Sequence, residues 1–113
     1  MERIEKVLDN LNIGMYYWYK KEDGTWYGLV EFWTYTAGQD IPIEIGFDGT
    51  AEDFVKKFCE AAESYDVDEK VELFIGMRGK NGVPNTVRKL LDDCQEAKDT
   101  LMEIAEKLKE AMA

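Results

Sequence analysis

The spacing of apolar residues near the beginning of the chain predicts a helix. These residues recur at i, i+3, i+4 and i+7, the spacing that places side chains on one helix face: Ile4, Val7, Leu8 and Leu11. Asn12 and Gly14 follow, and both residue types commonly end helices. We therefore expect an amphipathic helix over residues 2–11.

The pattern then changes to short runs rich in aromatic and β-branched residues, which are typical of strands. Three such runs cover residues 15–19, 26–35 and 41–47. Asp23 and Gly24 separate the first two runs, and an Asp-Gly step supplies the positive φ of a hairpin turn. Apolar residues alternate in the third run, where Pro42 indicates a strand start or a sheet edge because proline lacks an N–H. The sequence predicts a three-stranded antiparallel meander.

Helical patterns return in the second half of the chain. Thr50 precedes two acidic residues, which is typical of a helix N-terminus. An apolar stripe at helical spacing follows: Phe54, Phe58, Ala61, Ala62 and Tyr65. Asp66 and Glu69 have the spacing of a capping box, which favours a further short helix within residues 67–77. Alternating apolar residues in this segment support a strand as the rival interpretation, and we favour the helix.

The last helix is predicted to be long. It follows a loop over residues 78–85, begins near Asn85 and runs almost to Ala113. Its apolar positions alternate spacings of three and four: Val87, Leu90, Cys94, Ala97, Leu101, Ile104, Leu108 and Ala111. Such a seam packs against another helix as in a coiled coil. We expect packing within the domain; the alternative is self-association through residues 101–112, using Leu101, Ile104, Leu108 and Met112.

Together these elements predict a single α+β domain over residues 1–113, with a three-stranded antiparallel sheet packed against helices and a long C-terminal helix. The chain begins with a charged helical pattern rather than a secretory signal, and its longest uncharged run, residues 10–19, is too short to span a bilayer. Cys59 and Cys94 lie in predicted helices without CxxC spacing, so we expect reduced core thiols and a cytoplasmic protein.

Composition narrows the chemistry. The chain has no His and a single Ser, Ser64, which removes the usual general base, the usual nitrogen ligand of metals and most nucleophilic triads. We assign no catalytic residue, no metal and no cofactor. The formal net charge is −10, from 24 acidic and 14 basic residues, so direct binding to nucleic acid or to an anionic membrane is disfavoured. A basic protein partner is compatible with this charge.

Aromatic residues concentrate in the first two predicted strands, on both of their faces. One face must be core, and the other would be an aromatic platform suited to anchoring a protein interface unless a helix covers it. The candidate residues of this platform are Tyr16, Trp18, Trp26, Tyr27, Trp33 and Tyr35. Tyr hydroxyls that reach water from a packed face are the simpler alternative.

Acidic residues are densest between residues 48 and 72, and they form a second candidate surface: Asp48, Glu52, Asp53, Glu60, Glu63, Asp66, Asp68, Glu69 and Glu72. Solvated helix faces explain most such runs, and a calcium loop is not supported because the ligand spacing fails. A weaker candidate is an anion site at the start of the last helix, formed by Arg78, Lys80, Arg88 and Lys89. A solvated turn is the simpler explanation for it.

Three short segments resemble small acidic proteins of unknown function that are carried on bacterial mobile elements and phages. The segments are residues 65–69, residues 82–84 and residues 90–93, within a resemblance that covers residues 54–108. The resemblance implies a protein-binding accessory role, such as inhibition of a host defence nuclease. It implies no catalytic residue.

Three functional hypotheses follow from the sequence. The first is a non-enzymatic acidic module that binds a protein partner. The second is a small-ligand binder or an enzyme that uses carboxylates and Tyr hydroxyls in a cavity against the sheet. The third is a structural homo-oligomer, in the simplest case a homodimer, formed through the C-terminal helix.

Overall fold

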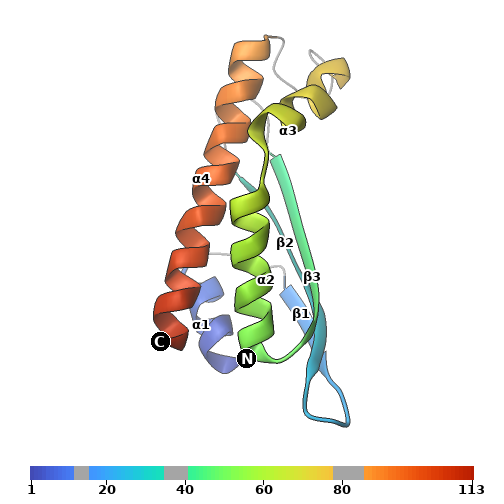
Figure 1. The fold of residues 1–113 in the computed structure, drawn as a ribbon, viewed down its shortest axis with the longest axis vertical. Coiled ribbons are helices and arrows are strands. Elements are labelled where there is room, and N and C mark those ends of the chain that lie inside the picture. Colours follow the sequence, from blue (N-terminus) through green and yellow to red (C-terminus); the bar gives the residue numbers. More distant parts are fainter. Residues whose placement is uncertain (12–15, 35–40, 78–85) are drawn as a thin grey trace.

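The computed structural model describes residues 1–11, 16–34, 41–77 and 86–113 (Figure 1). The elements follow in the order α1 (Glu2–Asn10), β1 (Tyr16–Lys20), β2 (Trp26–Thr34), β3 (Ile41–Gly49), α2 (Ala51–Ser64), α3 (Val67–Phe74), the 3-10 turn η1 (Ile75–Met77) and α4 (Val87–Met112). The α+β class, the three-stranded antiparallel sheet and the long C-terminal helix are confirmed. The predicted loop over residues 78–85 lies outside the described residues.

The sheet has the order β1-β2-β3, with both pairs antiparallel. Gly24 has a φ of 87° in the hairpin turn, as the Asp-Gly step predicts. β3 begins at Ile41 and lies at the edge of the sheet, which agrees with the position of Pro42. Gly28 has a role that the sequence did not indicate, because a Cβ there would overlap the Tyr17 carbonyl oxygen and lie 2.5 Å from Trp18 Cβ. Glycine therefore permits the close approach of β1 to β2.

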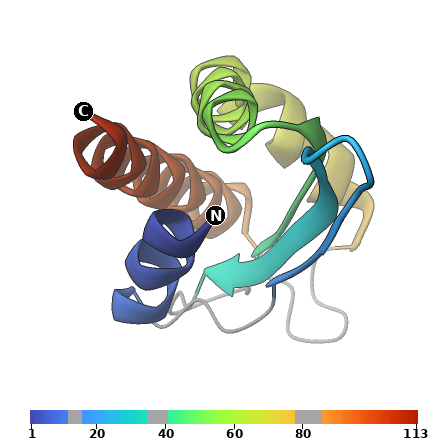
Figure 2. The ribbon, with the colours of Figure 1, turned by 90° about the horizontal axis from the view of Figure 1, so that it is seen from below.

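All the helices that contact the sheet lie on one of its faces, which we call the inner face; the opposite side is the outer face (Figure 2). Every second residue of each strand points inward. Six of these inward side chains are buried: Val30, Phe32, Ile41, Ile43, Ile45 and Phe47. They pack against apolar residues of α1, α2 and α4, including Leu8, Phe54 and Leu101, in one continuous core. Figure 2 shows no described helix over the outer face.

Helix α2 begins with a complete capping box, in which Thr50 Oγ1 accepts from the Asp53 N–H and Asp53 Oδ2 accepts from the Thr50 N–H. Asp66 caps α3 by accepting a hydrogen bond from the Glu69 N–H, so the helical interpretation of this segment is confirmed and the strand alternative is wrong. Ile75, expected on the apolar stripe of this helix, is instead 39% exposed at the point where α3 ends and the 3-10 turn η1 begins.

Helices α2 and α4 lie side by side and antiparallel (Figure 1). Lys98 on α4 joins them, because its Nζ donates to the carbonyl oxygens of Ala62 at 3.2 Å and Tyr65 at 2.6 Å. These carbonyls belong to the last turn of α2 and to its C-cap, where a cation is favourable. The first turns of α4 extend beyond α2 and pack against α3 of the same chain.

The apolar seam of α4 is buried inside this domain. Its central side chains are at most 3% exposed: Leu90, Cys94, Ala97, Leu101, Ile104 and Leu108. Met112 is half-buried against the same core, whereas Val87 at the other end is 41% exposed. The residues predicted to mediate self-association are therefore used within the monomer, since α1, α2, α3 and the sheet together cover the length of the helix. This favours the intramolecular alternative.

Candidate functional site: the outer face of the sheet

The register of the strands orders the outer-face residues into rows. Tyr19 lies opposite Tyr27, which lies opposite Asp48. The next row contains Tyr17, Leu29 and Gly46, and the third contains Glu31 and Glu44. Rows of one face are two residues apart, so neighbouring rows are about 6.7 Å apart along the strands.

Three tyrosines dominate the aromatic end of this face. Tyr17, Tyr19 and Tyr27 are 52%, 64% and 56% exposed. The rings of Tyr19 and Tyr27 stack, with centroids 6.3 Å apart and planes inclined by 23°. Because the rigid strands hold these rings, they would lose little conformational entropy on contact with a partner. We refer to Tyr17, Tyr19 and Tyr27 as the outer tyrosines.

A hollow of about 410 Å³ opens beside the outer tyrosines. It is lined by Tyr17, Tyr27, Gly28, Leu29, Gly46, Phe47, Asp48 and Lys57. Gly46 leaves room here, since a Cβ at this position would make only ordinary contacts, 3.8 Å from the Gly28 carbonyl oxygen and 3.9 Å from Leu29 Cδ1. The hollow is therefore wide enough for one apolar side chain of a partner.

Asp48 lines this hollow, and Glu31 and Glu44 lie in the adjacent row of the outer face. Glu44 and Asp48 lie two residues on either side of Gly46 and point to the same outer face. Asp48 already has an ion-pair partner, because Lys21 Nζ lies 2.5 Å from its Oδ1. Glu31 and Glu44 lie directly opposite each other, an arrangement of like charges that destabilises a sheet. Neither of the two has an ion-pair partner within the part of the chain that the structure describes.

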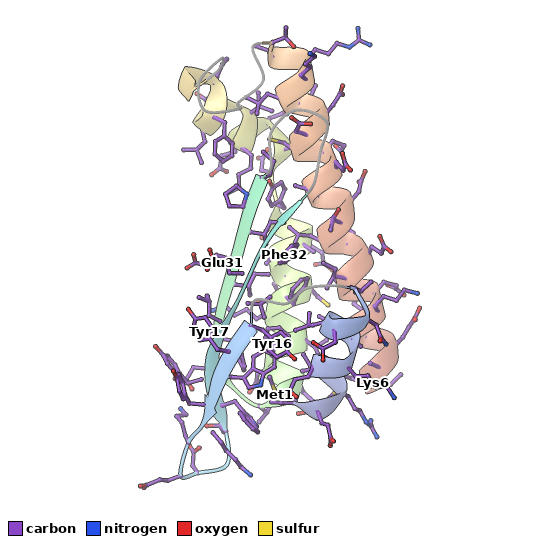
Figure 3. All side chains as sticks on the ribbon, turned by 180° about the vertical axis from the view of Figure 1, so that it is seen from behind. Met1, Lys6, Tyr16, Tyr17, Glu31 and Phe32 are labelled. Carbon is purple, nitrogen blue, oxygen red and sulfur yellow. The ribbon has the colours of Figure 1, made fainter. Side chains whose placement is uncertain are left out.

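The structure divides the predicted aromatic residues between the two faces of the sheet. Tyr16, Trp18 and Trp26 belong to the inner face, where each is half-buried and packs against the core. Figure 3 shows Tyr16 directed toward the helices and Tyr17 directed away from them. Tyr27 is exposed, as predicted. The side chain of Trp33, like Tyr35, lies outside the described part of the chain.

Contacts with α1 and α2 explain why Tyr16 and Trp18 are unsuited to a binding platform. The Tyr16 hydroxyl donates to Asp9 Oδ1 at 2.9 Å, and this hydrogen bond raises the pKa of Tyr16. Trp18 Nε1 donates to Glu5 Oε1 at 2.8 Å. The Trp18 ring is also 6.0 Å from the rings of Phe47 and Phe54. Sequence reasoning missed Tyr17 and Tyr19, because the face to which they point depends on the register of β1 with β2 and β3.

The acidic candidates do not form one uniform surface. Asp53 and Asp66 cap helices, and Asp48 pairs with Lys21, so these three have structural roles. The hydrogen bond from the Thr50 N–H lowers the pKa of Asp53. The other predicted residues are exposed on two diverging helices: Glu52, Glu60 and Glu63 on α2, and Asp68, Glu69 and Glu72 on α3 (Figure 1).

A second hollow, of about 430 Å³, lies where α2 and α3 meet α4; Asp66 and Lys98 in its lining have structural partners, whereas the buried Tyr65 hydroxyl has no hydrogen-bond partner among the described residues. This hollow is lined by Glu63, Ser64, Tyr65, Asp66, Val67, Asp68, Gln95 and Lys98. Lys98 is held by carbonyls at the end of α2, and Asp66 caps α3. Burial raises the pKa of Tyr65 to about 12 and that of nearby Cys94 to about 11. Both shifts move the pKa of these groups further above pH 7, away from the range in which acid–base catalysis is most efficient.

The weaker anion candidate is only partly described. Arg88 and Lys89 are exposed in the first turn of α4, while Arg78 and Lys80 lie outside the described residues. The Lys89 N–H already donates to Thr86 Oγ1 at 3.2 Å, so one of the free donors at this helix end is satisfied by the cap. Within the described ranges, no group of three or more Cys, Asp or Glu side chains is arranged to hold a metal ion.

None of the helices among the described residues is long and apolar enough to cross a membrane. The chain matches no protein-family model, and neither a curated protein nor a solved structure matches it significantly. The resemblance to proteins of mobile elements and phages stays a prediction. The candidate site therefore rests on the geometry of the outer sheet face.

Proposed function

We propose that this protein is a non-enzymatic module that binds a protein partner through the outer face of its sheet. The observation that supports this proposal most strongly is the exposure of Tyr17, Tyr19 and Tyr27 on a face that no described helix covers. Tyrosine is enriched in protein interfaces, and fixed rings contribute most of the binding energy where they become desolvated.

The net charge of −10 favours a partner with a basic surface. Proteins that handle nucleic acid have such surfaces, because they neutralise phosphates with Lys and Arg. An accessory protein of a mobile element that inhibits a host nuclease is the specific form of this proposal. Its support is the charge of the chain and the resemblance of residues 54–108.

Affinity capture from bacterial lysate, followed by mass spectrometry, tests the proposal with two matched triple variants. The first replaces each outer tyrosine with Ser: Tyr17→Ser, Tyr19→Ser and Tyr27→Ser. The control replaces three exposed apolar residues on α3 and α4, which are 65%, 40% and 45% exposed: Leu73→Ser, Leu91→Ser and Met102→Ser. Circular dichroism must show that both variants are folded at the temperature of capture.

A protein retained by the wild type and by the control, and lost with the Tyr variant, is the expected result. Elution of that protein at high salt would support the basic character of its surface. Equal retention by both triple variants would contradict binding through this face. Recovery of only further copies of the bait would instead favour a homo-oligomer.

A further inference from the structure

The outer face combines a hollow that has Leu29 and Gly46 in its lining with a pair of glutamates in the adjacent row that has no cation beside it among the described residues. Gly46 lines the hollow, and Glu31 and Glu44 form the next row along β2 and β3. Figure 3 shows Glu31 on the side of the sheet that points away from the helices, as Tyr17 does. A ligand that spans both rows would contact Leu29 and Gly46 in one row and the two carboxylates in the next, about 6.7 Å further along the strands.

The Glu31–Glu44 pair breaks a local rule of sheet stability. Like charges directly opposite each other raise the free energy of the sheet, and the described residues offer neither carboxylate a compensating cation. A cation bound between them would relieve this repulsion. Positions where a sequence sacrifices local stability in this way are candidates for function.

The charges around the hollow also indicate where the cation would bind. Lys57 lines the hollow and Lys21 pairs with Asp48, so the end of the hollow near Asp48 already has cations. The row of Glu31 and Glu44 has none among the described residues. A cationic group would therefore bind at the glutamates, with an apolar group in the hollow beside it.

We propose that the outer face binds an extended segment of its protein partner that carries an apolar residue and an arginine two positions apart. Alternate residues of an extended chain are about 6.7 Å apart, which matches the distance between the two rows. The apolar side chain fills the hollow at Gly46 against Leu29. The planar guanidinium donates to the carboxylates of Glu31 and Glu44, and it can stack on the neighbouring Tyr17 ring. This inference rests on the proposed function and names the chemistry of the partner.

A second copy of this chain fits the same surface poorly. Two copies would bring two net charges of −10 together and would place two Glu31–Glu44 pairs in one interface. Juxtaposed like charges disfavour such an association. The charge complementarity therefore favours a cationic partner.

A titration followed by ¹⁵N-correlated NMR tests this inference with the pentapeptide Gly-Leu-Gly-Arg-Gly, acetylated and amidated at its ends. We expect saturable shifts at the backbone amides of Leu29, Glu31, Glu44 and Gly46, with a dissociation constant on the order of millimolar. Replacing the arginine with citrulline, which keeps the shape and removes the charge, should weaken binding about tenfold.

Two sets of variants separate the two halves of the site. Glu31→Gln with Glu44→Gln should weaken peptide binding about tenfold, while the matched control Glu103→Gln with Glu106→Gln, exposed on α4, should leave it unchanged. Gly46→Val should abolish the response by filling the hollow, and its unaltered spectrum elsewhere would show that the fold is kept.

Equal affinity for the arginine and citrulline peptides, or for wild type and the Glu31/Glu44 double variant, would overturn the inference. Shifts that map to α4 would overturn it as well. Shifts of the outer face that depend on protein concentration without peptide would assign the surface to a second copy. If a captured partner needs the outer tyrosines but is indifferent to Glu31→Gln with Glu44→Gln, the proposed function stands and this inference fails.

Discussion

Four consecutive aromatic residues on β1 divide between two environments. Tyr16 and Trp18 face the helices, where Asp9 and Glu5 accept their hydrogen bonds. Tyr17 and Tyr19 face away from the helices and are more than half exposed. The difference follows from the alternation of side chains along a strand. It shows that aromatic density alone does not identify a binding surface, because the same segment contributes to the core and to the candidate interface.

The largest effect is expected when a charge is placed in the core between the sheet and the helices, where it should unfold the protein. Leu101→Glu would place an unpaired carboxylate at a position that is 1% exposed, and we expect a loss of more than about 4 kcal/mol of the free energy of unfolding. The adjacent Met102→Glu, at a position 45% exposed, should change stability by less than about 0.5 kcal/mol. Urea denaturation of both variants measures this contrast. A folded, stable Leu101→Glu monomer would indicate that α4 is not packed as described.

Truncation of aromatic residues should show the same division between the two faces. Phe54 is fully buried, with its ring centroid 4.6 Å from that of Phe47, so Phe54→Ala should cost about 3–5 kcal/mol. Tyr27→Ala removes an exposed ring that stacks with Tyr19, and it should cost about 1 kcal/mol or less. Equal losses in urea denaturation would contradict the assignment of the two faces.

Two glycines of the sheet provide a finer comparison. Gly28→Ala should destabilise the protein by about 1–3 kcal/mol, because the new Cβ would meet the backbone of β1. Gly46→Ala should stabilise it by up to about 1 kcal/mol, because alanine lowers the entropy of the unfolded chain and the space at Gly46 is open. Thermal unfolding of the two variants is sufficient to distinguish these signs. Two variants that destabilise equally would show that the outer face is covered at Gly46.

A further comparison concerns pH. Burial raises the pKa of Tyr65 from 10.0 to about 12, so between these values the unfolded state loses this proton and the folded state keeps it. Stability should therefore fall as pH rises from about 10 to 12. Tyr65→Phe should reduce the slope across this window, and the remainder should include Cys94, whose raised pKa acts in the same direction. An unchanged slope in Tyr65→Phe would contradict the burial of the Tyr65 hydroxyl.

Local patterns were sufficient to predict most of the fold. The capping residues Thr50 and Asp66, the turn at Gly24 and the alternation in β3 are encoded within a few residues, and the structure has each of them. Helical spacing also predicted the buried stripe of α4. What covers that stripe is not local, because it depends on how α1, α2 and α3 pack along the helix.

The candidate site was harder to predict for the same reason. Alternation separates Tyr17 from Tyr16, but the sequence of β1 alone does not say which of them faces the helices. Register also matters: the Glu31–Glu44 pair and the hollow at Gly46 exist only because β2 and β3 align as they do. The structural roles of Asp48 and Lys98 likewise depend on contacts between distant segments.

Hydroxyl-radical footprinting of the tyrosines, with and without a captured partner, tests the central claim most directly. In the free protein, we expect oxidation of Tyr17, Tyr19 and Tyr27 to be faster than that of Tyr16 and Tyr65, which are less exposed. When the partner is bound, the three outer tyrosines should become protected while exposed Met102 on α4 remains reactive. Protection of Met102 with continued oxidation of the outer tyrosines would show that the partner binds elsewhere and would contradict the account.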